Sequence, residues 1–211
     1  MAKITLDNQT APATPASGVS SLYVDTTAKE LMHIADDGNK KMVRTLTNTG
    51  STTTAGANIY IVGSNIAVPP ALARVGNIFH WYLVMSKSAA CTSAPVYNIV
   101  VGTAGTTADA VRLTWTSAQL QTAATDNGVL EFWCAVTTAG ASGIINGGYV
   151  LHHKNQTTGF CATQQDAQGP TASSAFDLTV ASLIFGLTIN PGNTGANAVW
   201  TITTFAEGKN L

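Results

Sequence analysis

The sequence is poor in charge. Only 10% of its 211 residues are Asp, Glu, Lys or Arg, against about 25% in an average soluble domain. Ten basic and eleven acidic residues leave a net charge of −1, whereas binding to nucleic acid or to an anionic membrane surface requires clustered Lys and Arg. The composition therefore predicts that neither nucleic acid nor a membrane is a partner.

Apolar runs and cysteines are also scarce. The first residues, MAKITLDNQTAPATP, lack the apolar core of a signal peptide, and no segment has about 18 uninterrupted apolar residues. We therefore expect synthesis in the cytoplasm and no membrane span. The three cysteines, Cys91, Cys134 and Cys161, form an odd set without C-x-x-C spacing, which predicts buried free thiols rather than a disulfide framework or a zinc site.

The surface must be filled largely by uncharged residues. Hydrophobic residues make up 45% of the chain, which is enough for a substantial core. With so little charge, much of the surface must be Thr, Ser, Asn, Gln, Ala and Gly, and such a surface is inexpensive to desolvate. Large contact areas of low charge are typical of permanent assemblies, which we therefore favour. The alternative is an extracellular monomer with a Thr-rich surface.

The first 44 residues differ from the rest, because they hold ten of the 21 charged side chains (10 basic plus 11 acidic). Pro12 and Pro15 favour an extended arm, which buries too little surface to be ordered without a partner. After Gly18, the segments SSLYVDT, ELMHIAD and KKMVRTL predict a small β-meander of three short strands, with turns at 26–29 and 36–39. Strands this short require a neighbour or further copies of themselves to pack against.

Composition divides the chain into three regions. Residues 1–46 are predicted to form the arm and the meander, residues 47–57 a charge-free linker rich in Thr and Gly, and residues 58–211 a separate domain. About eight apolar runs in the last region are broken by Gly, Asn, Pro and Thr and show no helical period. The pattern predicts an all-β fold, an antiparallel β-sandwich of jelly-roll type, with 116–125 as the one helix candidate.

Alternation with period two predicts the core faces of three strands. The opposite face of the first of these strands carries His80, Tyr82 and Val84, and it is more apolar than a solvent-facing surface usually is. We therefore expect a neighbouring subunit to cover that face. The predicted core positions are Phe79, Trp81, Leu83 and Met85; Leu130, Phe132, Cys134 and Val136; and Trp200, Ile202 and Thr204.

Catalytic chemistry has little support in the sequence. Glycoside hydrolysis requires two carboxylates facing one cleft, and the carboxylates of residues 58–211 are scattered without a recognisable motif. We therefore expect no enzyme, no catalytic residue and no cofactor. These carboxylates are Asp109, Asp126, Glu131, Asp166, Asp177 and Glu207.

The histidines do not form a metal site in the sequence pattern. His152 and His153 are adjacent on a predicted strand and should point to opposite faces, so both cannot bind one ion without a bulge. A ring of one His from each of three subunits stays open as an alternative. His33 and His80 stand alone in strands, where a core or interface position is expected. We predict no bound metal.

The tryptophans leave a choice between core packing and sugar binding. Exposed tryptophans would provide a stacking platform for carbohydrate, which jelly-roll domains can bind. Each tryptophan lies inside an apolar strand run, however, and this favours packing in the core or in an interface. The four residues are Trp81, Trp115, Trp133 and Trp200.

The stretch LDNQTAPATPASG, followed by SSLYVDTTAKELMHIADDGNKKMV, resembles the arm and meander that begin many tailed-bacteriophage virion proteins, both capsid decoration proteins and tail fibres. The remainder is similar to the jelly-roll domain that accompanies them in some of these proteins, around FHWYLVMSKSAA, VYNIVVGTAGTTADAVRLTWT, TTGF and FDLTVASLIFGLTIN. The resemblance implies a homotrimer without catalytic residues. Tail fibres are commonly far longer, whereas this chain has room for one anchor and one head.

The resemblance thus implies a head decoration or cement protein, made in the host cytoplasm and bound to the exterior of the virion capsid. Such a trimer would bind the major capsid protein and stabilise the shell by mass action. The alternative is a receptor-binding tail fibre or carbohydrate-binding head that recognises host surface glycans, and weak glycan binding is compatible with either role. The expected capsid contacts are Leu6, Pro12, Pro15, Leu22, Tyr23 and Met32, and the expected trimer-interface residues are Tyr82, Val84 and Trp133.

Overall fold

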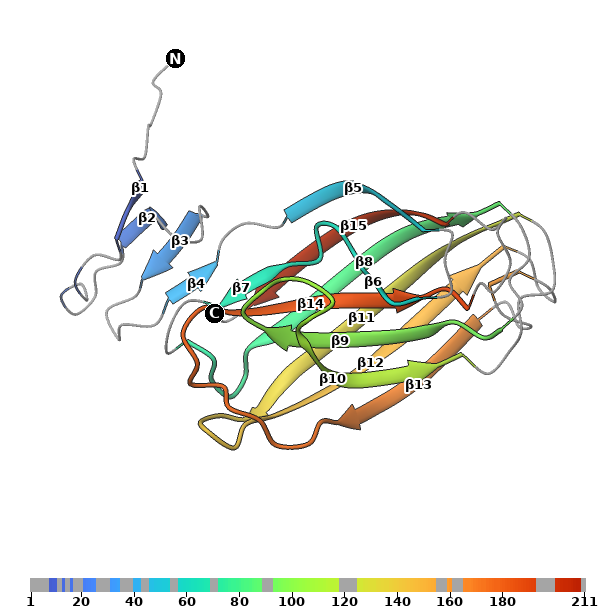
Figure 1. Cartoon of the computed structure of the whole chain (residues 1–211). Coiled ribbons are helices and arrows are strands. Elements are labelled where there is room, and N and C mark those ends of the chain that lie inside the picture. The colour runs from blue at the N-terminus through green and yellow to red at the C-terminus, as the bar shows by residue number, and fades with distance from the viewer. Residues whose placement is uncertain are drawn as a thin grey trace, which may run out of the picture.

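The structure is a computed structural model, and every regular element in its described part is a β-strand (Figure 1). The prediction of an all-β chain is confirmed for these residues. No described segment forms a helix of the length and apolarity needed to cross a membrane. The described residues are 8–10, 13, 16, 21–25, 31–34, 40–42, 46–53, 57–68, 72–88, 93–117, 125–154, 159–160, 165–192 and 200–209.

A small sheet near the N-terminus lies beyond one end of the main body (Figure 1). Its antiparallel strands β2, β3 and β4 form the predicted meander, which is confirmed. β1, however, pairs in parallel with β2, so the expectation that the arm is ordered only against a partner is wrong for these two residues. The bounds are β1 Asn8–Gln9, β2 Ser21–Asp25, β3 Leu31–Ile34 and β4 Lys40–Met42.

The larger of the two main sheets has six antiparallel strands in the order β13-β12-β11-β8-β15-β5. Its three central strands, β11, β8 and β15, are ten or more residues long, and the paired residues run without a break from one end of β8 to the other. The bounds are β5 Leu46–Thr53, β8 Ile78–Lys87, β11 Asp126–Thr138, β12 Ile144–His153, β13 Gln165–Ala172 and β15 Trp200–Lys209.

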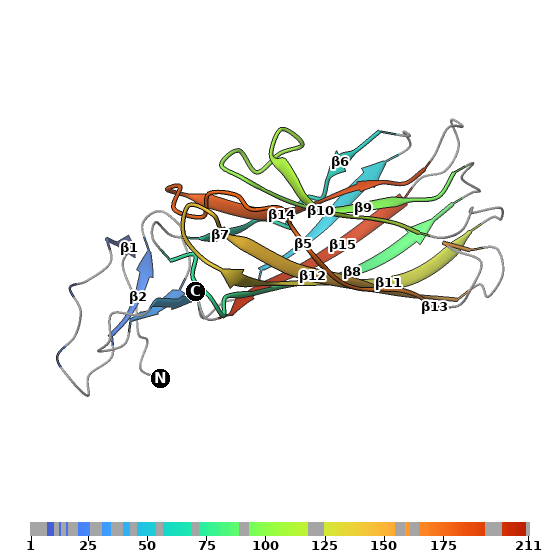
Figure 2. The same cartoon turned by 90° about the horizontal axis from the view of Figure 1, so that it is seen from below.

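The second main sheet has five antiparallel strands and packs against the first as a second layer (Figure 2). Its order is β10-β9-β14-β6, and β7 pairs with the other half of the same edge of β14. The two layers make the protein a β-sandwich, as predicted. The bounds are β6 Ile59–Tyr60, β7 Ile66–Val68, β9 Val96–Gly102, β10 Ala110–Thr116 and β14 Leu183–Asn190.

The core between the sheets is aromatic. Phe79 of the six-stranded sheet stacks on Phe185 of the five-stranded sheet, with ring centroids 3.8 Å apart. Tyr97 packs edge-on against Phe132 across the same interior, at 5.8 Å. All the core positions predicted from the period-two alternation are buried, because successive side chains of a strand point to opposite faces of its sheet.

The predicted linker is the main error in the expected organisation. Residues 46–53 form β5, which pairs with β15 at the edge of the six-stranded sheet. After Leu46 the segment lacks large apolar side chains, but it is rich in Thr, whose branched Cβ favours strands, and an edge strand bonds to a neighbour on one side only. Strands β7 and β13 were not expected either, and residues 118–124 of the helix candidate lie outside the described part.

Candidate functional site

The outward-facing surface of the six-stranded sheet carries large apolar side chains at its centre. On this outer face, Tyr82 lies between Glu131 and Phe205 on the neighbouring strands, and Val84 lies between Val129 and Thr203 in the next row. Val84 is 50% exposed and Phe205 40%. We define the outer face by its apolar residues, Ile78, Tyr82, Val84, Val129, Trp133 and Phe205.

Few charges interrupt the outer face. His80 lies between Trp133 and Glu207, and its Nε2 is 3.7 Å from Oε2 of Glu131. Lys209 pairs with Glu207, with 3.2 Å between Nζ and Oε2. Exposed pairs of this kind contribute only about 0–1 kcal/mol each, so they add little to the stability of the subunit. The face therefore combines an apolar centre with a few polar and charged side chains.

The three residues predicted for a subunit interface come together on this face. Tyr82 is half-buried, while Val84 and Trp133 are exposed, the latter at 37%. Phe205 was missed by the sequence analysis, although the inward alternation of Trp200, Ile202 and Thr204 implies that Phe205 points outward.

The predicted capsid contacts lie in and around the N-terminal sheet. Leu22 on β2 is 50% exposed and is available for contact. Tyr23 is fully buried within the chain, which contradicts its expected place on a docking surface, because adjacent strand residues face opposite ways. Met32 lies in β3, but its side chain is outside the described part, as are Leu6, Pro12 and Pro15.

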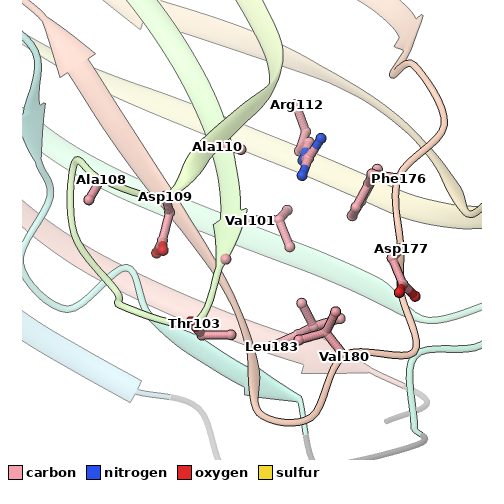
Figure 3. Close-up of a pocket in the computed structure, with 11 residues that line it drawn as sticks. Val101, Thr103, Ala108, Asp109, Ala110, Arg112, Phe176, Asp177, Val180 and Leu183 are labelled. Carbon is pink, nitrogen blue, oxygen red and sulfur yellow. The ribbon is translucent and has the colours of Figure 1, made fainter. Parts of the chain in front are cut away.

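A cavity of about 290 Å³ opens where β9 ends and β10 and β14 begin (Figure 3). Arg112, on β10, and Phe176, on the segment that follows β13, line one side of it. The guanidinium carbon of Arg112 lies 4.3 Å from the centroid of the Phe176 ring, a cation–π contact. The sequence analysis did not single out either residue, because nothing in the spacing brings them together.

The carboxylates of the sandwich mostly have structural partners. Asp109 accepts hydrogen bonds from the main-chain N–H groups of the loop before it, at 2.7–3.3 Å. Asp166 accepts from the hydroxyls of Ser117 and Tyr149, each at 2.7 Å. These contacts tie loops and strands together, and their geometry favours a structural role for both carboxylates.

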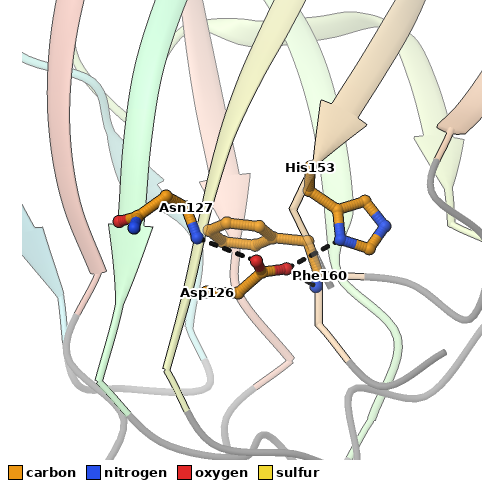
Figure 4. Close-up of polar contacts among 4 residues, drawn as sticks. All are labelled: Asp126, Asn127, His153 and Phe160. Carbon is orange, nitrogen blue, oxygen red and sulfur yellow. Dashed lines mark hydrogen bonds and ion pairs between the residues drawn. The ribbon is translucent and has the colours of Figure 1, made fainter. Parts of the chain in front are cut away.

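A fully enclosed polar cluster is formed by Asp126 and His153 at one end of the six-stranded sheet (Figure 4). The side chains of both residues have no solvent exposure, and His153 Nδ1 lies 2.7 Å from Asp126 Oδ2. The same oxygen accepts from the main-chain N–H of Phe160 at 2.9 Å, and Oδ1 accepts from that of Asn127 at 2.9 Å. The carboxylate thus joins β11, β12 and the segment at Phe160.

The histidines and cysteines give no metal centre in the part of the chain that the structure describes. His152 is exposed and His153 buried, which confirms that the two point to opposite faces. Cys134 is a buried free thiol, as predicted, and burial raises its pKa. Cys91 and Cys161 lie outside the described residues. His33 lies in β3, but its side chain is outside the described part.

Three of the four tryptophans are core residues. Trp81 and Trp200 are fully buried and Trp115 nearly so, and the indole N–H of Trp81 donates to the carbonyl oxygen of Ser64 at 2.7 Å. A stacking platform made of all four is therefore wrong, and only Trp133 reaches the surface.

Comparisons with protein-family models, with curated proteins and with solved structures give no match for this chain. The resemblance to phage virion proteins therefore stays a prediction.

Proposed function

We propose that the chain is a non-enzymatic virion structural protein, a jelly-roll capsid decoration protein that binds the outer surface of a phage capsid as a homotrimer and stabilises it. The observation that carries the proposal is the outer face of the six-stranded sheet, whose exposed apolar centre requires a partner surface. The sequence resemblance supplies the virion and the trimer. The geometry of the chain supports three parts of the proposal.

The strand order supports the jelly-roll part. The strands pair in a nested order, in which the first strand of the sandwich pairs with the last and the innermost pair is consecutive in the chain. The pairs are β5 with β15, β6 and β7 with β14, β8 with β11, and β9 with β10. This nested pairing is what results when one long antiparallel hairpin is rolled into two sheets, as in the double Greek key of a jelly roll. The hairpin of β12 and β13 then extends the larger sheet beyond β11.

The size of the outer face supports a stable subunit interface. A sheet of six strands spaced by about 4.8 Å, with an average strand length of about 33 Å, covers roughly 800 Å². A standard protein–protein interface buries about 800 Å² on each partner. The aromatic side chains Tyr82, Trp133 and Phe205 also belong to the residue types that are enriched in such interfaces.

The N-terminal sheet supports a separate anchor. It lies beyond the end of the sandwich rather than in its core, and Leu22 presents an apolar side chain there (Figure 1). A cement protein has to hold both its own neighbours and the shell, and these two tasks fall here to two different parts of the chain. We therefore assign association to the outer face and capsid binding to the arm and N-terminal sheet.

The oligomeric state tests the assignment of the outer face. Light scattering on the purified protein should give three times the chain mass of 21.8 kDa, which is 65.4 kDa. Val84→Asp should give monomers, because it places three carboxylates in an apolar contact. Val111→Asp is the matched control, since Val111 is 49% exposed on β10 of the other sheet, and it should remain a trimer. A monomeric wild-type protein would contradict the proposal.

Capsid binding tests the function itself. The protein is mixed with capsids stripped of it and, separately, with host cells, and the bound copies in each pellet are counted. Saturation of capsids at a symmetric copy number, with empty cell pellets, is expected. Deletion of residues 1–17 should abolish capsid binding and leave the trimer intact. Binding to cells but not to capsids would instead indicate a receptor-binding head.

A further inference from the structure

The cavity is lined by the guanidinium of Arg112, a cationic group that stacks on Phe176 but has no carboxylate partner within the described residues. Arg112 lies at the bulge of β10, where the pairing with β9 shifts between Val111 and Leu113. Its Nε is buried and has no hydrogen-bond partner, and no described carboxylate forms an ion pair with the guanidinium. Nε is too enclosed to be reached from the cavity, but the two Nη atoms are accessible and have no hydrogen bond within the described residues, so they can donate to a ligand that supplies acceptor atoms.

A carboxylate with spare acceptor capacity lines the same cavity. Oδ1 of Asp177 accepts from the main-chain N–H of Thr179 at 2.7 Å and from its hydroxyl at 2.6 Å. These hydrogen bonds lower the pKa of Asp177, so the group is ionised at neutral pH. No hydrogen bond to Oδ2 occurs within the described residues, and Figure 3 shows the carboxylate beside Phe176. It is free to accept from hydroxyl groups.

The remaining walls are apolar or already satisfied. Val101, Val180 and Leu183 present aliphatic side chains, which suit the C–H face of a sugar ring. The carboxylate of Asp109 accepts hydrogen bonds from three main-chain N–H groups of the preceding loop. It therefore holds this loop at the edge of the cavity rather than binding a ligand. The volume of about 290 Å³ equals that of about ten water molecules in the liquid, which is room for one sugar ring.

We propose that this cavity binds a hexuronic acid, an acidic sugar whose carboxylate is held by Arg112 and whose hydroxyls donate to Asp177. A guanidinium binds a carboxylate through two parallel hydrogen bonds, and this pairing is stronger than a neutral contact. A doubly charged phosphate fits less well, because a single Arg offsets only one of its two charges and Asp177 repels a dianion more strongly than the singly charged sugar carboxylate. The proposal goes beyond the capsid role and does not depend on it.

Calorimetric titration of the full chain with sodium D-glucuronate tests the proposal, with D-glucose and inorganic phosphate at matched ionic strength as comparison ligands. Glucuronate should bind with a dissociation constant in the millimolar range, and the other two should give no binding heat. Saturation-transfer NMR on the same mixtures should show glucuronate protons, and no glucose protons, in contact with the protein. Equal binding of glucose and glucuronate, stronger binding of phosphate, or no binding at all would overturn the proposal.

Two variants separate the proposed contacts from a general effect on the fold. Arg112→Lys keeps the positive charge but cannot form two parallel hydrogen bonds to a carboxylate, so affinity for glucuronate should fall by about tenfold. Asp177→Asn, at an exposed position, should weaken binding and leave the thermal unfolding midpoint unchanged. Val111→Thr, next to Arg112 in sequence, is the control and should bind as the wild type does. Unchanged affinity in Asp177→Asn, or in a folded Arg112→Lys protein, would refute the assignment.

Discussion

Removal of the Asp126 carboxylate should destabilise the sandwich more than removal of any exposed carboxylate. Asp126 opens β11, and its two oxygens hold His153 of β12 and the main-chain N–H groups of Asn127 and Phe160. Gly159 packs so closely on this pair that even a methyl group there would overlap Asp126. The substitution Asp126→Ala therefore takes a fully enclosed acceptor from three donors at once.

The magnitude follows from the burial of the cluster. The Asp126 and His153 side chains have no solvent exposure, so water cannot replace the lost contacts without a rearrangement. Each buried donor left unbonded costs about 1–3 kcal/mol, and three donors lose their acceptor here. Because these contributions overlap, we expect Asp126→Ala to lower the free energy of unfolding by about 4 kcal/mol. The whole free energy of unfolding of a domain is about 5–15 kcal/mol, so this loss is a large part of it.

Urea denaturation followed by tryptophan fluorescence measures this loss. Asp126→Asn keeps one oxygen as an acceptor and should cost about half as much, provided that His153 changes its tautomer to accept from the amide. Asp177→Ala is the matched control, because its carboxylate also accepts from a main-chain N–H but is fully exposed, and its urea midpoint should stay unchanged. A loss below about 1 kcal/mol in Asp126→Ala would refute the reasoning.

Three further outcomes are expected. Cys134 should not react with a thiol reagent until the chain unfolds, because burial raises its pKa and encloses the sulfur. The reaction is followed in the Cys91→Ser, Cys161→Ser double variant, in which Cys134 is the remaining thiol. Burial raises the pKa of Tyr60 to about 12, so the contribution of its neutral phenol to the free energy of unfolding should be complete below about pH 10 and be lost as the pH rises toward 12. In Tyr60→Phe, the free energy of unfolding should therefore fall less between these two pH values. Gly186→Ala should cost about 2 kcal/mol, because a Cβ would overlap the hydroxyl of Tyr60, whereas Gly169→Ala, in open space, should be tolerated; urea midpoints compare the two.

The strand faces of the sandwich were predictable because one physical rule governs them. Alternation along 79–85 and 130–136 follows from the pleat alone, and burial in the structure matches it residue by residue. The outer face followed from the same rule, since Tyr82 and Val84 are too apolar for a solvent-facing row. The position of Phe205 was implied as well, although it was not singled out.

Other features depend on contacts between distant segments, which no local pattern reveals. The sequence of β5 predicts a linker because an edge strand needs no apolar face, and its partner β15 lies some 150 residues later. Asp126 and His153 are separated by 27 residues, and their contact depends on the register of β11 and β12. Arg112 meets Phe176 only because the segment that follows β13 passes beside β10.

The two proposed surfaces lie on different parts of the molecule, and this placement constrains how they can act together. The outer face belongs to the six-stranded sheet, whereas the cavity is lined by the ends of β9, β10 and β14 of the other sheet and by the loops beside them. The residues of the outer face are therefore separate from those that line the cavity. The chain enters β14 at the end of the sandwich that faces the N-terminal sheet (Figures 1 and 2). If that sheet docks on a capsid, the cavity lies at the capsid-proximal end, and glucuronate binding should weaken when the protein is capsid-bound. Equal affinity of the free and the capsid-bound protein would show instead that the cavity stays accessible and that docking does not cover this end.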